Sequence, residues 1–485
     1  MKRTVTDERG TRLTLGEYLG GGGQGDVFAA KEGRLAIKII RPGSNISADL
    51  LRRRLERVRR LDLQGLPLAR PETVLRPPHI GYTMPLVSGT RALASLIRPG
   101  RDDHSPAQWF LNSGGLKGRL RVLAMLARVL HQLHTRGVVY GDLSAENVRI
   151  SGDPLDDISL HLIDCDNLRV ESSPDPTCLY TPGYAAPELI ANRSGANTLS
   201  DLHAFAVLAH ECLTGVHPFL GDVVLGGAPE NEERAYAGEF PWIDDPIDRS
   251  NTCTTGVPRT RVVSEVTREL FTRAFGPGRI DPVARPRLAE WIDVLEQASD
   301  MVLRCPAPSC RATYFGARDE PECPWCGHSL PVNLTLTWLL WDPQTEGKPP
   351  YGRLVINPKH GTPLTQAWMR LTAGEPIRLE QRHLGRTVDI HTARSKPIAT
   401  LMLKSENGAA TVCEVTCAGD ESLRFIRRGN PSGMTPPEKI VPPGKRTLIN
   451  LKETTDAKNT VTSRAYLHLG TLETLHRVIR FGSKA

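Results

Sequence analysis

The stretch Tyr140-Gly141-Asp142-Leu143-Ser144-Ala145-Glu146-Asn147 places a carboxylate and a carboxamide five residues apart. It follows a segment with apolar residues at helical spacing, Leu116 to Thr135, and precedes a β-like apolar run. On a rigid loop, Asp142 can accept a hydroxyl proton while Asn147 offers its oxygen to a metal ion. Since an isolated loop Asp is most often a turn residue or a helix cap, the surrounding sequence has to decide between these readings.

A third polar residue follows the next predicted strand. The run Leu160-His161-Leu162-Ile163 ends in Asp164-Cys165-Asp166. A carboxylate at a strand end suits Mg²⁺, which binds few carboxylates and leaves room for phosphates. Asp164 is therefore a candidate metal ligand.

A glycine-rich stretch near the N-terminus satisfies the pattern G-x-G-x-x-G-x-V with Gly20, Gly22, Gly25 and Val27. Glycines let backbone N–H groups approach phosphate oxygens closely. The same glycines occur in dinucleotide-binding folds, but those require a helix directly after the loop. Here a second strand follows, so we favour a phosphate-binding hairpin over that alternative.

The next strand, Leu35 to Ile40, carries Lys38 among apolar residues. A lysine is costly to bury unless it has an anionic partner. The segment Asp49 to Leu63 repeats apolar residues at helical spacing, and its Glu56 is the partner that we expect. The alternative is an unrelated surface lysine and surface glutamate.

In this order and spacing, the motifs resemble the eukaryotic-type protein kinase family, from the glycine loop to about residue 300. The later chain adds further matches. Thr181-Pro182-Gly183-Tyr184-Ala185-Ala186-Pro187-Glu188 is similar to the segment that closes the activation region. Ser200 to Val207 resembles the helix whose Asp201 braces the catalytic loop, and Leu213 to Phe219 its exit. Arg285 matches the arginine that pairs with Glu188.

The resemblance implies an ATP-dependent serine/threonine protein kinase that uses Mg²⁺ or Mn²⁺. Asp142 would orient the substrate hydroxyl, and Lys38, paired with Glu56, would hold the α- and β-phosphates. Asn147 and Asp164 would hold the metal. Thr181 stands where serine/threonine kinases have it. The nucleotide site implied by the resemblance consists of Gly20, Gly22, Gly25, Val27, Ala36, Lys38, Met84, Leu86, Asn147 and Asp164.

Three departures from the family pattern bear on activity. Gly141 stands where an arginine reads an activation-loop phosphate, and Ser144 where a lysine faces the γ-phosphate. Asp166 replaces a flexible glycine. We therefore expect phosphoryl transfer that is slower or more dependent on a partner. The alternative is a pseudokinase that binds ATP and acts as a scaffold through its C-terminal domains.

The G-D-L-S-x-x-N and D-x-D patterns, with Gly238 to Ile243, resemble a bacterial subgroup associated with tellurite-resistance-type gene clusters. That resemblance implies bacterial signalling or stress response and protein substrates. It also implies two partners, a von Willebrand factor A domain protein and a metal-dependent protein phosphatase.

Four cysteines form two close pairs, Cys305 with Cys310 and Cys323 with Cys326. Two such pairs separated by a short loop supply four thiolates for tetrahedral Zn²⁺, so we expect a structural zinc ribbon. A redox dithiol is the alternative, and His328 is a competing ligand with poorer spacing. With its basic and aromatic residues, the ribbon could also belong to a nucleic-acid binder.

The predicted fold class is α+β: a bilobal kinase fold, a small zinc ribbon and a C-terminal all-β, sandwich-like domain. We expect a kinase domain over residues 1–300, with a small lobe over about 1–84, a large lobe over about 88–300 and a cleft between them. The zinc ribbon would span 301–330 and a β-rich interaction domain 331–485. Residues 220–260, rich in Gly, Pro, Asp and Asn, predict a surface insertion.

Composition is that of an ordinary globular protein, with 39% hydrophobic and 24% charged residues among 485. The N-terminus lacks the apolar stretch of a secretory signal, and no apolar run reaches the ~18 residues that span a bilayer. We therefore expect a cytoplasmic protein with no membrane partner. The net charge of +7 resides partly in the arginine run after Leu51, which is typical of a solvated helix face, so we do not expect a nucleic-acid partner.

Overall fold

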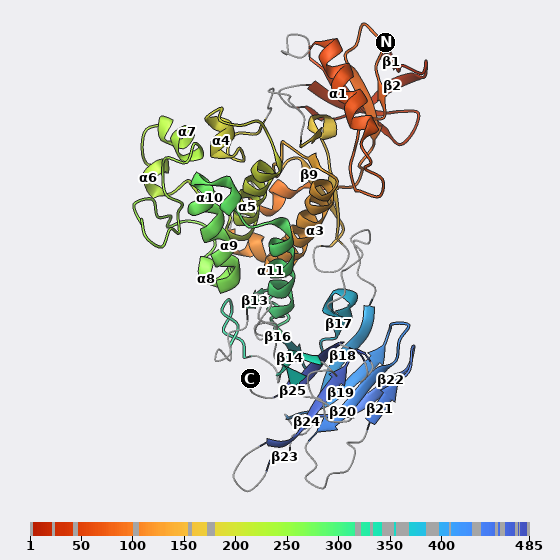
Figure 1. Cartoon of the computed structure of the whole chain (residues 1–485), viewed down its shortest axis with the longest axis vertical. Coiled ribbons are helices and arrows are strands. Elements are labelled where there is room, and N and C mark those ends of the chain that lie inside the picture. Colours follow the sequence, from red (N-terminus) through yellow and green to blue (C-terminus); the bar gives the residue numbers. More distant parts are fainter. Residues whose placement is uncertain are drawn as a thin grey trace. The chain divides into compact units, whose positions relative to one another are not determined.

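The computed structural model divides the chain into two compact units, residues 1–296 and 297–485 (Figure 1). The boundary falls within one helix, α11 (Leu288–Met301). The structure describes residues 3–482 except 22–24, 42–46, 100–105, 154–157, 172–179, 316–321, 330–332, 342–353, 356–367, 385–396, 407–408, 429–437, 452–453, 456–460, 471–473 and 475.

The small lobe of the first unit is a six-stranded antiparallel sheet with one helix, in the strand order β1-β2-β3-β4-β6-β5. Its elements are β1 (Thr4–Thr6), β2 (Arg12–Gly21), β3 (Gly25–Ala30), β4 (Leu35–Ile40), α1 (Ala48–Arg60), β5 (Thr73–Val74) and β6 (Gly81–Pro85). Leu51 and Leu55 of α1 pack against Ala36 and Ile40 of β4 in one buried cluster. This packing follows from the apolar stripe of the helix, so the predicted helix and strands of this lobe are confirmed.

The large lobe is mainly helical and contains short two- and three-stranded sheets. Its long helices are α3 (Gly115–Thr135), α5 (Thr198–Thr214), α9 (Glu265–Phe275) and α11. Helix α3 confirms the helical spacing of Leu116 to Thr135, and α5 contains the helix expected over Ser200 to Val207. Its shorter helices are η1 (Leu93–Leu96), α2 (Pro106–Asn112), η2 (Cys165–Asn167), α4 (Pro187–Ile190), α6 (Asp222–Leu225), α7 (Glu230–Tyr236), α8 (Arg259–Val262), α10 (Pro277–Ile280) and η3 (Pro282–Ala284). Its strands are β7 (Arg91–Ala92), β8 (Val138–Val139), β9 (Val148–Ser151), β10 (Ser159–Leu162) and β11 (Arg169–Val170).

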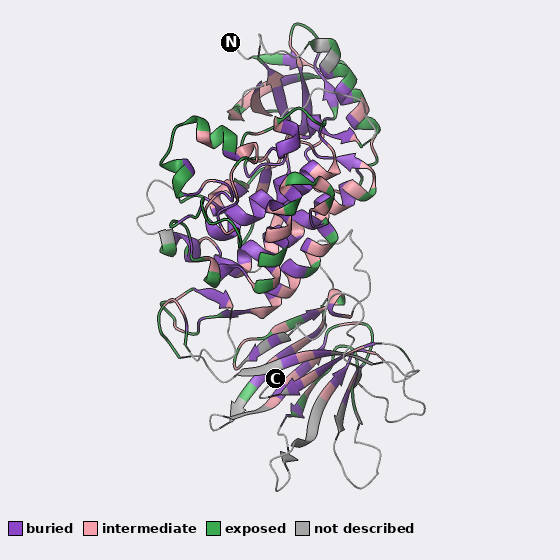
Figure 2. Cartoon of the chain, turned by 60° about the vertical axis from the view of Figure 1, so that its left-hand side comes forward, coloured by how far each residue is buried: buried purple, intermediate pink, exposed green. Residues whose placement is uncertain are grey.

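Helix α5 forms the centre of this lobe and is buried from Ser200 to Thr214 (Figure 2). A helix whose residues are buried on all sides lies inside a core, and its polar side chains need partners there. Asn197 and Ser200 cap its N-terminus reciprocally, the Asn197 side chain accepting from the Ser200 N–H at 2.9 Å. The first turn of α5 is therefore fixed, and with it the side chain of Asp201, which belongs to the site described below.

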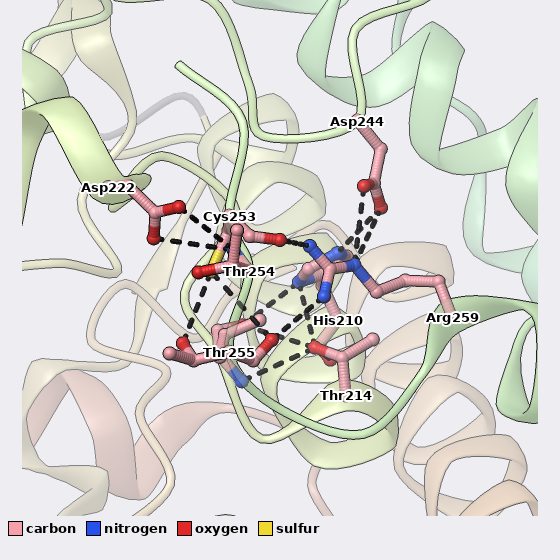
Figure 3. Close-up of polar contacts among 9 residues, drawn as sticks. His210, Thr214, Asp222, Asp244, Cys253, Thr254, Thr255 and Arg259 are labelled. Atoms are coloured by element: carbon pink, nitrogen blue, oxygen red, sulfur yellow. Dashed lines mark hydrogen bonds and ion pairs between the residues drawn. The ribbon is translucent and has the colours of Figure 1, made fainter.

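Residues 220–260 are anchored to the lobe more firmly than the predicted surface insertion implies. Trp242 and Ile243 are each only 2% exposed, because their large apolar side chains enter the core beside α5. Arg259 clamps the segment by donating to Asp244 at 3.2 Å and to the Cys253 carbonyl at 2.7 Å (Figure 3). The polar composition of residues 220–260 therefore reflects these internal hydrogen bonds as well as exposed turns.

The second unit begins with the hairpin β12 (Val302–Arg304) and β13 (Thr313–Phe315), and continues as two antiparallel sheets. One sheet contains β14 (Asn333–Trp341), β15 (Leu354–Val355), β16 (Trp368–Thr372), β20 (Leu423–Arg428), β21 (Glu438–Val441), β23 (Thr454–Thr455), β24 (Val461–His468) and β25 (His476–Gly482). The other contains β17 (Ile377–Glu380), β18 (Pro397–Glu406), β19 (Ala409–Cys417) and β22 (Arg446–Asn450). Side chains of both sheets, such as Leu336 and Leu401, share one core, as in a β-sandwich.

A buried polar cluster joins the last turn of α11 to η5 (Gln381–Leu384) within the second unit. Arg382 donates to both oxygens of Asp300, at 2.8 and 2.6 Å. His383 lies 3.1 Å from the same carboxylate and stacks on Trp338. Arg382 and His383 hold the pKa of Asp300 far below its usual range despite burial.

Candidate functional site

The loop between β8 and β9 is held by Asp201 of α5. One oxygen of Asp201 accepts from the Tyr140 N–H at 2.8 Å, and the other accepts from the Gly141 N–H at 2.9 Å. The ring of His134, at the end of α3, lies 2.9 Å from the same carboxylate. Because α5 is buried and capped, the loop that carries Asp142 and Asn147 has a rigid support.

Gly141 has a φ of +86°, a conformation that costs side-chain-bearing residues about 1–2 kcal/mol. Glycine adopts this conformation without strain, so Gly141, which replaces the arginine of the family pattern, fits the loop. The departure seen in the sequence is thus compatible with the backbone of this loop.

Asp142 and Asn147 meet as the spacing predicts. The Asn147 amide donates to the Asp142 backbone carbonyl at 2.9 Å, so its Oδ1 is the atom that can face a cation. Thr181 donates to Asp142 Oδ1 at 2.8 Å. Burial raises the pKa of Asp142, although the bond from Thr181 opposes that shift. Asp142 and Thr181 line a pocket together with Tyr180 and Tyr184.

Lys38 lies in the middle of β4 and is 4% exposed. Its Nζ makes a short contact with Asp164 and lies 3.3 Å from Asp166 Oδ2. Burial alone would lower the pKa of Lys38, but these two carboxylates raise it above its usual value. Burial and Asp166 raise the pKa of Asp164 to about 6. Burial disfavours the charge on Asp166, yet Lys38 keeps the pKa of that carboxyl below its usual value.

The predicted ion pair between Lys38 and Glu56 is wrong. Glu56 is solvent-exposed on α1, and among the described ion pairs Lys38 contacts only Asp164 and Asp166. The physical reason is the phase of the helix. Leu55 is fully buried, and the residue after it is turned about 100° around the helix axis.

The turn after β10 is tightly enclosed. Asp164 has a φ of +58°, a left-handed conformation that Asp tolerates better than most residues and that is common at functional sites. The Tyr140 hydroxyl donates to the Ile163 carbonyl at 2.5 Å, which fixes the residue before Asp164. Cys165 is fully buried, and burial raises the pKa of its thiol well above the usual value.

The predicted nucleotide-binding residues of the small lobe lie on neighbouring strands. Ala36 of β4 is the register partner of Met84 on β6, and Val27 of β3 that of Lys38. A Cβ on Gly25 would lie 2.3 Å from the Ile39 carbonyl, so only glycine fits there. Gly20 is in β2, and Leu86 follows β6 and packs against the core that includes Met84. Gly22 lies outside the described residues.

Glu188 and Arg285 form the pair that the resemblance implied. Two parallel bonds of 2.7 Å join the guanidinium to both carboxylate oxygens. Arg285 also donates to the carbonyls of Gly278 and Leu199, each at 2.8 Å. This pair fixes the segment that begins at Thr181 to the base of the lobe.

The four cysteines of the second unit converge. Their sulfur atoms all lie within 4.8 Å of one another, and those of Cys305 and Cys326 are 3.5 Å apart. Ligand atoms of a tetrahedral zinc, at Zn–S of about 2.3 Å, are about 3.8 Å apart, so the geometry fits this ion. His328 contributes its backbone carbonyl to the Cys323 N–H, at 2.9 Å, and is not in the group of candidate ligands.

Two contributors to the lysine environment were missed in the sequence. Asp166 was noted only as a departure from the family pattern, and Tyr82 was not considered. The Tyr82 ring centroid lies 5.7 Å from Lys38 Nζ, because Tyr82 is its register partner on β6. The buried-strand position of Tyr82 opposite Lys38 was the only available signal.

Comparisons with known proteins agree with this geometry. Residues 13–231 match the family model for the protein kinase domain. The DNA damage-responsive serine/threonine-protein kinase RqkA of Deinococcus radiodurans is 28% identical over 260 residues, which cover 51% of this chain and 35% of that protein. The serine/threonine-protein kinase PknE of Mycobacterium tuberculosis is 24% identical over 365 residues, covering 68% and 57%. PknL of the same species is 29% identical over 186 residues, covering 35% and 43%.

The chain thus spans less than two thirds of the length of each of these relatives. In the part of the chain that the structure describes, no helix is long and apolar enough to cross a bilayer. Residues 13–231 are therefore similar to protein kinase domains, and the proteins that resemble this chain include bacterial serine/threonine-protein kinases.

Proposed function

We propose that this protein is a serine/threonine protein kinase of bacterial signalling that transfers the γ-phosphoryl group of ATP to a protein hydroxyl. The observation that carries the proposal is the adjacency of two pairs, Lys38 with Asp164 and Asp142 with Asn147. Their segments are joined where the Ile163 N–H donates to the Asn147 carbonyl at 3.0 Å. Catalysis of this reaction is mainly positioning and charge neutralisation, which require a fixed base and fixed counter-charges.

The residues fit a magnesium nucleotide. One buried ammonium faces two carboxylates, so the group carries an excess negative charge that a divalent cation would balance. Asp164 and the Oδ1 of Asn147 would hold the cation, and Lys38 the phosphates. Bound Mg·ATP would supply the phosphoryl group.

Asp142 would orient the acceptor hydroxyl and receive its proton. The bond from Thr181 holds one carboxylate oxygen, which leaves the other for the acceptor. Ser144 lacks the positive charge that the family has there, so we expect slow transfer.

Labelled ATP and Mg²⁺ test this proposal, with wild type compared against Asp142→Ala and Lys38→Ala. We expect wild type to label itself or a protein substrate and each variant to lose at least ~100-fold of that rate. If wild type labels no protein above the variants, the kinase proposal fails and the scaffold alternative gains support.

We also propose that Cys305, Cys310, Cys323 and Cys326 hold a structural Zn²⁺ within a ribbon over residues 301–330. The close approach of the four sulfurs supports this, and so short a segment gains most of its folding energy from metal. Metal analysis should find about one zinc per chain, and Cys323→Ser should lose it. A folded wild-type protein without zinc would contradict the ribbon.

Residues 331–485 are proposed as a docking module for a partner or substrate. The bacterial subgroup that the sequence resembles suggests a von Willebrand factor A domain protein and a metal-dependent protein phosphatase. Purified candidates of both kinds can be offered as phosphorylation substrates, with labelling above that of a generic basic protein as the supporting result.

A further inference from the structure

The buried ammonium of Lys38 has a second carboxylate whose role the kinase reaction leaves unassigned. Asp166 Oδ1 and Oδ2 lie 3.4 and 3.3 Å from Lys38 Nζ. Both residues are 4% exposed. A buried ion is strongly destabilising without its partner, so each of these charges requires the other.

Helix α1 has no carboxylate that could serve Lys38. Its acidic residues, Asp49 and Glu56, are both exposed. Among the side chains of α1 that the structure describes, the buried ones are Leu51, Arg54, Leu55 and Val58. The helix packs against η2, the short turn that contains Asp166. The carboxylate beside Lys38 therefore comes from that turn.

The two carboxylates of the turn differ in their freedom to move. The Asp164 side chain is 28% exposed, whereas that of Asp166 is 4% exposed. If Asp164 turns towards a metal ion, Asp166 remains beside the ammonium. The Tyr82 ring centroid lies 5.7 Å from Nζ and also contributes to this environment.

We propose that Asp166 is the positioning residue for Lys38: it holds the ammonium towards the nucleotide phosphates, so that no carboxylate from α1 is needed. This inference rests on the proposed kinase function and specifies how its lysine is oriented. It also implies that displacement of α1 does not by itself release the lysine, because the partner of Lys38 lies outside that helix.

The test compares two isosteric losses of a carboxylate, Asp166→Asn and Glu56→Gln. Binding of Mg²⁺ with a non-hydrolysable ATP analogue is measured by calorimetry, and kcat and KM for ATP are measured by labelling. For Asp166→Asn we expect analogue binding weakened about 10-fold or more and kcat reduced about 10- to 100-fold. Glu56→Gln should stay within about twofold of wild type.

A double-variant cycle separates positioning from a general structural role. If Asp166 acts through Lys38, Asp166→Asn should add little loss in a Lys38→Met background, since the group that it positions is gone. The inference is wrong if Asp166→Asn binds and turns over ATP like wild type. It is equally wrong if Glu56→Gln loses as much, or if the losses of Lys38→Met and Asp166→Asn multiply.

Binding of the ATP analogue is measured without turnover. The kinase proposal and the Asp166 proposal can therefore fail separately. Wild type that binds the analogue but labels nothing overturns the kinase proposal, while the cycle in binding still tests Asp166. Wild type that binds no analogue also overturns the kinase proposal. In that case the coupling between Lys38→Met and Asp166→Asn is measured from the melting temperatures of the variants. If Asp166→Asn does not fold, a folded Lys38→Met/Asp166→Leu, with both charges removed, supports the pairing, and an unfolded one contradicts it.

Discussion

Two buried charged groups of the first unit differ in how fully their charges are matched. The Arg285 guanidinium donates hydrogen bonds to both oxygens of Glu188 and to two backbone carbonyls. Its side chain is fully buried. Lys38 faces two carboxylates at once, and the pKa of Asp164 is raised to about 6 by burial and by the second carboxylate. One pair is electrically balanced, and the other has an excess of negative charge.

The balanced pair of Arg285 and Glu188 is typical of a structural support, whereas the unbalanced group around Lys38 is typical of a functional site. A network whose donors and acceptors are all satisfied gains nothing from a ligand and resists rearrangement. A buried group with an excess of negative charge is costly to bury, and it is stabilised when a cation binds. The same excess charge therefore gives it affinity for a cation. The comparison predicts that changes to Arg285 or Glu188 act mainly on folding, and that loss of the excess carboxylate, Asp164, acts mainly on activity.

The largest effect is expected for Arg285→Ala. It leaves the Glu188 carboxylate buried without its cation, which should lower the free energy of unfolding by about 3–5 kcal/mol. Arg273→Ala is the matched control, because its pair with Glu290 is more than a third exposed and should cost less than about 1 kcal/mol. Urea unfolding measures both, and equal losses would break the comparison.

A large effect on activity alone is expected for Asp164→Asn. Phosphoryl transfer should fall at least ~100-fold, because the proposed metal ligand is lost. The free energy of unfolding should be unchanged or higher, since one of two like charges is removed and Lys38 keeps Asp166. The same labelling and urea assays apply. A variant that is active yet unstable would reverse the assignment of the two pairs.

A smaller effect concerns His217, which belongs to the supporting part of the domain. Its Nε2–H donates to the Gly183 carbonyl at 2.8 Å, and Nδ1 accepts from the Phe219 N–H. Burial lowers the pKa of His217 to about 4, against about 6.5 in the unfolded chain. Between these pKa values the folded state binds fewer protons than the unfolded state. The contribution of His217 to the free energy of unfolding is therefore fully present above pH 6.5 and is lost as the pH falls towards 4.

For His217 we expect about 2 kcal/mol of stability to be lost between pH 7 and pH 5. His217→Gln, which cannot titrate, should show a decline smaller by that amount. Urea unfolding at the two pH values measures it. If both proteins decline equally, His217 is not the group responsible.

The parts of the fold that sequence could predict are those with strong local signals. The spacing of Leu51, Leu55 and Val58 predicted α1, and the apolar run around Lys38 predicted β4, because one face or one strand must be buried. The anchoring of residues 220–260 could not be predicted. It depends on Trp242 entering a core formed by helices distant in sequence.

In the site, the catalytic loop was predictable and the lysine partner was not. Asp142 and Asn147 are joined by local geometry, so their spacing was enough. The partners of Lys38, Asp164 and Asp166, lie 126 and 128 residues away. Glu56 was predicted instead, because it is an acidic residue on the helix that follows the lysine strand. The helical phase argued against that choice, since Glu56 directly follows the buried Leu55 and so lies off the buried stripe.

The enclosure of Cys165 has a consequence for chemical biology. A cysteine between the two carboxylates invites the idea of a covalent inhibitor for this kinase domain. Its sulfur is fully buried, contacts the Leu162 carbonyl at 3.5 Å, and carries a thiol whose pKa is raised. Electrophilic warheads react with accessible thiolates, so this cysteine should remain unmodified while the protein is folded. Selective compounds for this site would have to rely on shape and charge rather than on bond formation with sulfur.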